Sequence, residues 1–173
     1  MTLKMTDNRI LSFLTDTRYY CSAVENAPEM TKEEFVADML TILPRLYVGI
    51  SDIGGKNIPP EIEDEYFSSY VDEDLYNSVR MQMESIMGED DMYLETVEED
   101  MKYSDTPIAA SVSEGLADIF QDLYNFTRRV ADSEGEVLDG AMRECKENFE
   151  AYWGQTLCNT MRALHSICYS HKD

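Results

Sequence analysis

The sequence predicts an all-α protein, a single-domain bundle of about five helices with long acidic loops between them. Apolar residues recur at three- and four-residue spacing over most of the chain, which is the pattern of helices with one buried face. No stretch shows the alternation of a half-buried strand, and no repeat of solenoid length is visible. Since 173 residues suit one hydrophobic core, we expect a single helical domain over residues 1–173.

The first two helices are predicted at about 8–26 and 31–51. The first carries a buried stripe that begins with Ile10. The start of the second is marked more clearly, because Thr31 can cap the helix and Glu34, three residues later, completes a capping box.

A third helix is predicted at about 72–87, with the Asp72 carboxyl as its cap and Gly88 as its C-terminal glycine. The segments before and after it, 52–71 and 88–106, are rich in acids and longer than usual helix connections. Long loops of this kind are either functional or partly mobile.

The fourth helix is predicted at about 107–131. Thr106 supplies a cap residue, and Pro107 suits the first helical position because its missing N–H would have no partner there. The apolar stripe that includes Leu116 and Phe120 makes this the best amphipathic pattern in the chain.

The last helix is predicted at about 134–169. Ser133 and Glu136 have the spacing of a second capping box, and apolar residues keep helical spacing almost to the end. We expect Gly140 and Gly154 to mark bends or close contacts within it.

The charge of the chain is strongly acidic, with a formal net charge of −21. Because 43% of the residues are hydrophobic, the acidity belongs to a folded protein rather than a disordered one. Residues 57–101 hold fifteen acids and one base, a net charge of −14. Such a field repels nucleic acid and acidic membranes and attracts basic proteins. With no apparent signal peptide or membrane span, a cytoplasmic location is expected.

Two segments carry a family resemblance: MKYSDTPIAASVSEGLADIFQDLYNF (101–126) and ECKENFEAYWGQTLCNTMRALH (144–165). They resemble the signature of an uncharacterised family of Bacteroidetes proteins, about as long as this chain, that is known only as a domain of unknown function. The resemblance implies a bacterial, intracellular, helical domain. It implies no activity, substrate or cofactor.

Two acidic rows are the candidate metal-binding residues. Glu114, Asp118 and Asp122 stack along one helix edge, and Glu147 belongs to a row on the last helix that runs from Glu144 to Glu150. Facing carboxylates on bundle helices can hold metal ions. Solvated helix edges are the favoured interpretation, since exposed acids are common. The alternative is a metal-dependent hydrolase of a nucleotide or other phosphate substrate that uses Glu114, Asp118, Asp122 and Glu147.

Cysteine and histidine residues near the C-terminus have the chemistry of zinc ligands. Cys158, His165, Cys168 and His171 spread around one helix, however, and cannot all converge on one ion. All four cysteines are expected as free thiols, and no metal site or cofactor is predicted.

The chain contains none of the phosphate-binding, nucleophile-elbow or zinc-protease motifs, so a non-catalytic role is favoured over an enzyme. We expect an interaction or adaptor protein that docks a basic protein on acids and aromatic residues of its loops. A narrower alternative is a nucleic-acid mimic. The predicted docking surface consists of Glu61, Glu63, Asp64, Glu65, Tyr66, Tyr70, Glu95, Glu98, Glu99 and Asp100. The sequence leaves the partner and the oligomeric state open.

Overall fold

The fold is all-α with one small β-hairpin, and the computed structural model describes residues 3–53, 67–95, 102–103 and 105–170. Two short 3-10 turns follow α1 and α3, and a π-helical turn separates α5 from α6. The elements are α1 (Asn8–Glu25), α2 (Lys32–Asp52), α3 (Glu73–Met87), β1 (Met92–Glu95), β2 (Ile108–Ser111), α4 (Val112–Asp132), α5 (Leu138–Asn148), the π-helix Phe149–Trp153 and α6 (Gly154–Tyr169).

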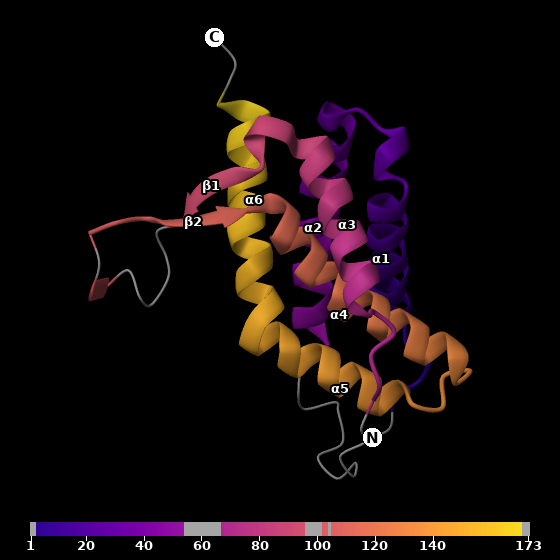
Figure 1. Ribbon diagram of the computed structural model, residues 1–173. Helices are drawn as coiled ribbons and strands as arrows, with labels where there is room; N and C mark the ends of the chain where they lie inside the picture. Colours follow the sequence, from indigo (N-terminus) through magenta and orange to yellow (C-terminus); the bar gives the residue numbers. More distant parts are fainter. Residues whose placement is uncertain (1–2, 54–66, 96–101, 104, 171–173) are drawn as a thin grey trace.

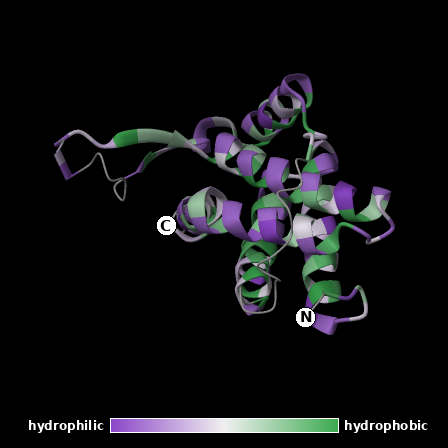
Figure 2. Ribbon diagram, turned by 90° about the horizontal axis from the view of Figure 1, so that it is seen from below, coloured by the Kyte–Doolittle hydropathy of each residue, from purple (hydrophilic) through white to green (hydrophobic). Residues whose placement is uncertain are grey.

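Helix α4 is the centre of the arrangement. It packs against α1, α3, α5 and α6, and it crosses the bundle obliquely while α1, α2 and α6 run side by side (Figure 1). Helix α5 lies across one end of the bundle. The hairpin of β1 and β2 extends away from the helices, as the view from below also shows (Figure 2). Any groove beside α4 is therefore bounded by several elements at once.

The starts of α2 and α3 follow the capping signals in the sequence. The Thr31 hydroxyl accepts from the Glu34 N–H at 3.2 Å, and the Glu34 carboxylate accepts from the Thr31 N–H at 2.9 Å. The Asp72 carboxylate accepts from the N–H of Leu75 at 2.8 Å. Gly88 follows α3 with φ of 57°, which a glycine adopts without steric cost. Both predicted caps are confirmed.

The predicted start of the fourth helix at 107 is wrong, and so is the expectation that the chain has no strand. β2 occupies this segment and pairs antiparallel with β1, with Met92 opposite Ser111 and Glu95 opposite Ile108. Helix α4 begins only afterwards, where the Ser111 hydroxyl accepts from the Glu114 N–H at 3.2 Å. Four-residue strands are too short to show a clear alternation, so local signals favoured the wrong cap.

The buried Asp91 side chain fixes this corner. Its carboxylate accepts from the N–H of Ser113 at 2.7 Å and from the Ser113 hydroxyl at 2.8 Å. The Asp91 carbonyl accepts from the N–H of Val112 at 2.9 Å. A residue 21 positions earlier in the chain therefore determines where α4 begins. This is a tertiary contact, which helix-capping rules based on neighbouring residues do not include.

The predicted last helix is divided into two helices and starts late. Ser133 is the C-cap of α4, and Glu134 and Gly135 turn the chain with φ of 51° and 86°. The Gly135 N–H donates to the Val130 carbonyl at 2.9 Å and closes a Schellman-type end. Since residues at positive φ cannot lie within a helix, Ser133 and Glu136 form no capping box, and α5 begins at Leu138.

The π-helix Phe149–Trp153 interrupts the remainder, and its geometry explains Gly154. A Cβ at Gly154 would lie 2.6 Å from the Phe149 carbonyl oxygen. The close contact expected at Gly154 is therefore present, but it lies within the chain's own turn rather than against another helix. The turn also buries Trp153, whose indole N–H donates to the Cys145 carbonyl at 3.1 Å.

Candidate functional site

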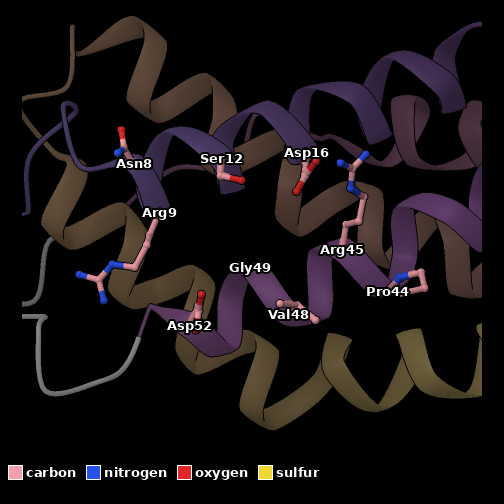
Figure 3. A pocket seen from close by; sticks show the side chains of 9 residues that line it. All are labelled: Asn8, Arg9, Ser12, Asp16, Pro44, Arg45, Val48, Gly49 and Asp52. Atoms are coloured by element: carbon pink, nitrogen blue, oxygen red, sulfur yellow. The ribbon is translucent and has the colours of Figure 1, made fainter.

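A hollow of about 460 Å³ lies between α1 and α2. Figure 3 shows Arg45 of α2 reaching toward Asp16 of α1 across it. Arg9 at its other end pairs with Asp7 at 3.2 Å, and Asp52 also lines the hollow. Because two arginines and two aspartates share this small surface, it has no net preference for an anion or a cation.

A second hollow, of about 490 Å³, has a more distinctive chemistry, and we name it the α4 groove. It lies where α4 meets α5, the π-helix and the segment that precedes α3. Most of the side chains that form it are polar. They include Asp118, Asp122, Asn125 and Arg129 of α4, Asn148 of α5 and Tyr152 of the π-helix.

Two carboxylates stand on the groove side of α4, one helical turn apart. The Tyr76 hydroxyl of α3 donates to Asp118 Oδ1 at 2.6 Å, and the Asn148 amide of α5 donates to Asp122 Oδ1 at 2.8 Å. Within the described part of the chain, no hydrogen bond reaches the Oδ2 atom of either residue. Each carboxylate is thus held by one oxygen and retains the other for a ligand.

The protein environment disfavours the charged form of both carboxyls. Partial burial raises the pKa of Asp118 and of Asp122 above the ordinary aspartate value. Neighbouring negative charge adds to the effect: Glu114 raises the pKa of Asp118, and Asp118 raises that of Asp122. A cation that entered the groove would counteract both effects, since it would replace the hydration lost on burial and offset the repulsion between the carboxylates.

The inner end of the groove is a structural anchor. Arg129 is 7% exposed and forms an ion pair with Glu144 of α5. Its guanidinium also donates to the Ser68 carbonyl at 3.3 Å and lies over the Phe67 ring, 4.8 Å from the ring centre. Since breaking a buried ion pair leaves an uncompensated charge, we assign Arg129 to the fold rather than to ligand binding.

Asn125 completes this anchor. Its side-chain oxygen accepts from the Tyr70 N–H at 2.7 Å, and its amide donates to the Ser69 hydroxyl at 3.2 Å. The segment that leads into α3 is therefore held against α4, which fixes one wall of the groove.

The π-helix forms the opposite wall. It places Trp153 in the core and leaves Tyr152, which is 71% exposed, at the groove. π-Helical turns are rare and occur often at functional sites. An exposed aromatic ring beside carboxylates is a combination that recognises cations, since the ring face attracts positive charge.

The structure brings together two of the four predicted metal-binding acids. Asp118 and Asp122 both line the α4 groove, whereas Glu114 and Glu147 lie outside its lining. Among the described residues, no three His, Cys, Asp or Glu side chains are placed to hold one metal ion. Glu144, of the second predicted row, lines the groove but pairs with Arg129.

Sequence reasoning missed the groups that shape the groove. Asn125, Asn148 and Tyr76 come from three different helices, and no local pattern connects them. Arg129 was the one available signal, since a base on the apolar side of an amphipathic helix requires a buried partner.

Most of the predicted docking surface lies outside the described residues: Glu61, Glu63, Asp64, Glu65, Tyr66, Glu98, Glu99 and Asp100. Tyr70 is 40% exposed, and its ring lies 5.7 Å from the Arg128 guanidinium. The expectation that Glu95 belongs to the docking surface is wrong, because its side chain is 2% exposed and pairs with Arg162 at 3.4 Å. A buried, paired carboxylate offers no surface to a partner.

The four candidate zinc ligands do not form a site within the described residues. Cys158 and His165 are exposed, Cys168 is partly buried, and His171 lies outside the described residues. Cys21 and Cys145 are buried free thiols, and burial raises the pKa of each. Both are therefore unreactive core residues.

The family is established by sequence. The model of a domain of unknown function, DUF5063, matches residues 4–170. The chain belongs to this family. The resemblance carried by residues 101–126 and 144–165 is thereby confirmed. Among curated proteins, none matches the sequence.

A solved structure shares the DUF5063 fold seen here. The crystal structure of protein BF1032 from Bacteroides fragilis is similar, with 36% sequence identity, a TM-score of 0.83 and coverage of 96% of each chain. This likeness extends to the all-α fold and leaves function open. No described helix is long and apolar enough to cross a membrane.

Proposed function

We propose that this protein is a non-catalytic binding protein for a basic partner, and that the α4 groove receives a lysine or arginine side chain of that partner. The observation that carries the proposal is the pair Asp118 and Asp122. Each is fixed through one oxygen by a neighbouring helix and presents the other to a polar hollow. Two fixed acceptors on one edge match the donors of a guanidinium or ammonium group.

The surroundings support the same ligand class. Tyr152 adds an exposed ring for the aliphatic and cationic parts of such a side chain. The net charge of −21 attracts basic surfaces before contact and repels acidic ones. Arg129, the one base among the described residues that line the groove, is already paired with Glu144 and does not oppose an incoming cation.

A titration with short blocked peptides tests the proposal. A peptide with one central arginine should bind, and its neutral citrulline analogue should bind at least about tenfold more weakly, a difference of about 1.4 kcal/mol. The variant Asp118→Asn/Asp122→Asn should lose the preference for arginine over citrulline. Calorimetry or amide chemical shifts measure both.

The matched control is Glu136→Gln/Glu147→Gln, which removes the same charge from exposed residues outside the groove lining. This control should keep the preference. If both double variants weaken binding equally, only the overall charge matters and the groove has no specific role. If neither does, the proposal is wrong.

The two alternatives from the sequence stay hypotheses. A metal-dependent hydrolase would need ligands beyond Asp118 and Asp122, because Glu114 and Glu147 lie outside the groove lining. A nucleic-acid mimic would need acids spaced like phosphates, and most of the loop acids lie outside the described residues. No observation favours either over the binding of a cationic side chain.

A further inference from the structure

The outer edge of β1 faces a helix instead of a third strand. The Arg162 guanidinium of α6 donates to the Leu94 carbonyl at 3.4 Å, so this carbonyl points away from β2. The Asp91 carbonyl, three residues earlier, accepts from Val112 and points the other way. Since the N–H and C=O of one strand residue point to the same side, the backbone groups of Met92 and Leu94 face outward.

This edge opens onto a groove of about 390 Å³ between β1 and α6. Ala163 and Ile167 supply an apolar floor, Ser166 and Ser170 line the α6 side, and Glu89 lies at one end. A second hollow of about 430 Å³ continues from it toward α2, and it shares Asp90 and Ile167 with the first. The described residues contain no third strand that fills this space.

We propose that this β1–α6 groove binds an extended segment of a basic partner protein, which adds to β1 as a third strand. A groove between a strand edge and a helix suits an extended peptide, because the edge supplies main-chain hydrogen bonds and the helix supplies side-chain contacts. A two-stranded hairpin is also marginally stable alone, and a third strand would complete it.

The exposed face of the hairpin fits the same ligand. Met92 is 61% exposed and Leu94 is 60% exposed, and their side chains lie on one face of β1. Partner residues opposite them would place apolar side chains on that face. The alternate side chains of the added strand would then turn toward Ala163 and Ile167.

Charge decides between a basic partner and a second copy of this chain. Glu33, Glu89 and Asp90 surround Lys32 at the end of the groove, so this end is acidic on balance. Lys32 is already paired with Asp90 at 2.6 Å. A second copy, with its own charge of −21, would add repulsion, whereas a segment with lysine or arginine beside its apolar residues would not. The inference rests on the proposed function for the charge of the partner alone.

Amide hydrogen exchange tests the added strand residue by residue. The probe is a blocked hexapeptide of alternating lysine and valine, supplied at saturating concentration to the full chain. Exchange at the Met92 and Leu94 amides should slow at least tenfold. Exchange at Tyr93, whose N–H already points toward β2, should slow much less, through stabilisation of the hairpin alone. An unchanged exchange rate at Met92 and Leu94, or equal protection by a glutamate–valine peptide, would overturn the inference.

A pair of helix variants separates blockage from misfolding. Ser166→Trp fills the groove from the α6 side and should abolish the protection. His165→Trp adds the same bulk at an exposed neighbouring position outside the groove lining and should leave it intact. Protection that persists in Ser166→Trp would place the peptide elsewhere and overturn the inference.

The two proposals fail separately. In Asp118→Asn/Asp122→Asn, the protection at Met92 and Leu94 should persist, because the α4 groove is a different surface. Arginine-selective binding at the α4 groove with no protection of β1 would leave the proposed function standing and remove this inference. Protection of β1 without arginine selectivity at Asp118 and Asp122 would support this inference and remove the proposed function of the α4 groove.

Discussion

The negative charges of Asp118 and Asp122 lower the stability of the fold, and the same charges attract the proposed ligand. A pKa raised in the folded state means that the folded protein holds these protons more tightly than the unfolded chain does. The free energy of unfolding attributable to them therefore falls as pH rises through the folded pKa. Carboxyls whose charged form the fold disfavours in this way occur often at binding sites.

A thermal melt measures how much stability the two negative charges remove. At pH 7, Asp118→Asn/Asp122→Asn should raise Tm by about 2 °C or less, since water screens the partly exposed groups and the asparagine oxygens still accept from Tyr76 and Asn148. The difference from the wild type should vanish in acid, where both carboxyls are protonated. A marked fall of Tm at pH 7 would show that the carboxylates stabilise the fold.

Affinity for an arginine peptide should depend on the same two protonations, but it should rise with pH where the stability of the fold falls. Arginine-peptide affinity should decrease as pH falls through the raised pKa values, because protonated carboxyls no longer attract a cation. The loss should begin at a higher pH than for an ordinary aspartate. The pH profile of the Asp118→Asn/Asp122→Asn variant should be flat over that range.

At the scale of elements, the contact between α4 and α6 depends on Gly115. A Cβ at this position would overlap Thr160 Oγ1, so the absence of a side chain sets how closely the helices approach. The Thr160 hydroxyl is buried and has no hydrogen-bond partner among the described residues. The contact is therefore steric rather than polar.

Gly115→Ala should lower the free energy of unfolding by about 1–3 kcal/mol, although alanine is the better helix former by about 1 kcal/mol. Thr160→Ala in the same chain should restore part of the loss, because it removes the overlapping atom. Chemical denaturation of the two single variants and the double variant gives the coupling energy. Additive effects would show that the two residues do not touch.

Elements also show where local sequence signals succeed. The capping box of α2 and the Asp72 cap of α3 could be predicted because each involves residues within one turn. The start of α4 could not, since it depends on Asp91 and on pairing of two short strands. The prediction that Ser133 caps the start of the last helix was wrong for a related reason. Ser133 is the C-cap of α4, and Glu134, at positive φ, separates it from α5.

At the scale of the whole molecule, the net charge of −21 should control the rate of association with a basic partner. The association rate of an arginine peptide should fall as ionic strength rises, because salt screens the long-range field. Stopped-flow fluorescence over a salt series measures it. The Asp118→Asn/Asp122→Asn variant should keep most of this salt dependence and dissociate faster, since it loses short-range contacts. An association rate that does not change with salt would contradict steering.

The sequence by itself determined the fold class, the family, the positions of most helices and the sign of the charge, because these follow from periodicity, capping and composition. It also singled out Asp118 and Asp122, as candidate metal-binding residues; a cationic side chain as their ligand is our proposal. Only the tertiary structure showed that Glu114 and Glu147 lie outside the groove that Asp118 and Asp122 line, and that Glu95 is buried. It also showed that a strand edge lies beside α6. The physical reason is that a groove is made by side chains from helices far apart in the chain, such as Tyr76, Asp122 and Asn148, whose proximity depends on packing rather than on local pattern.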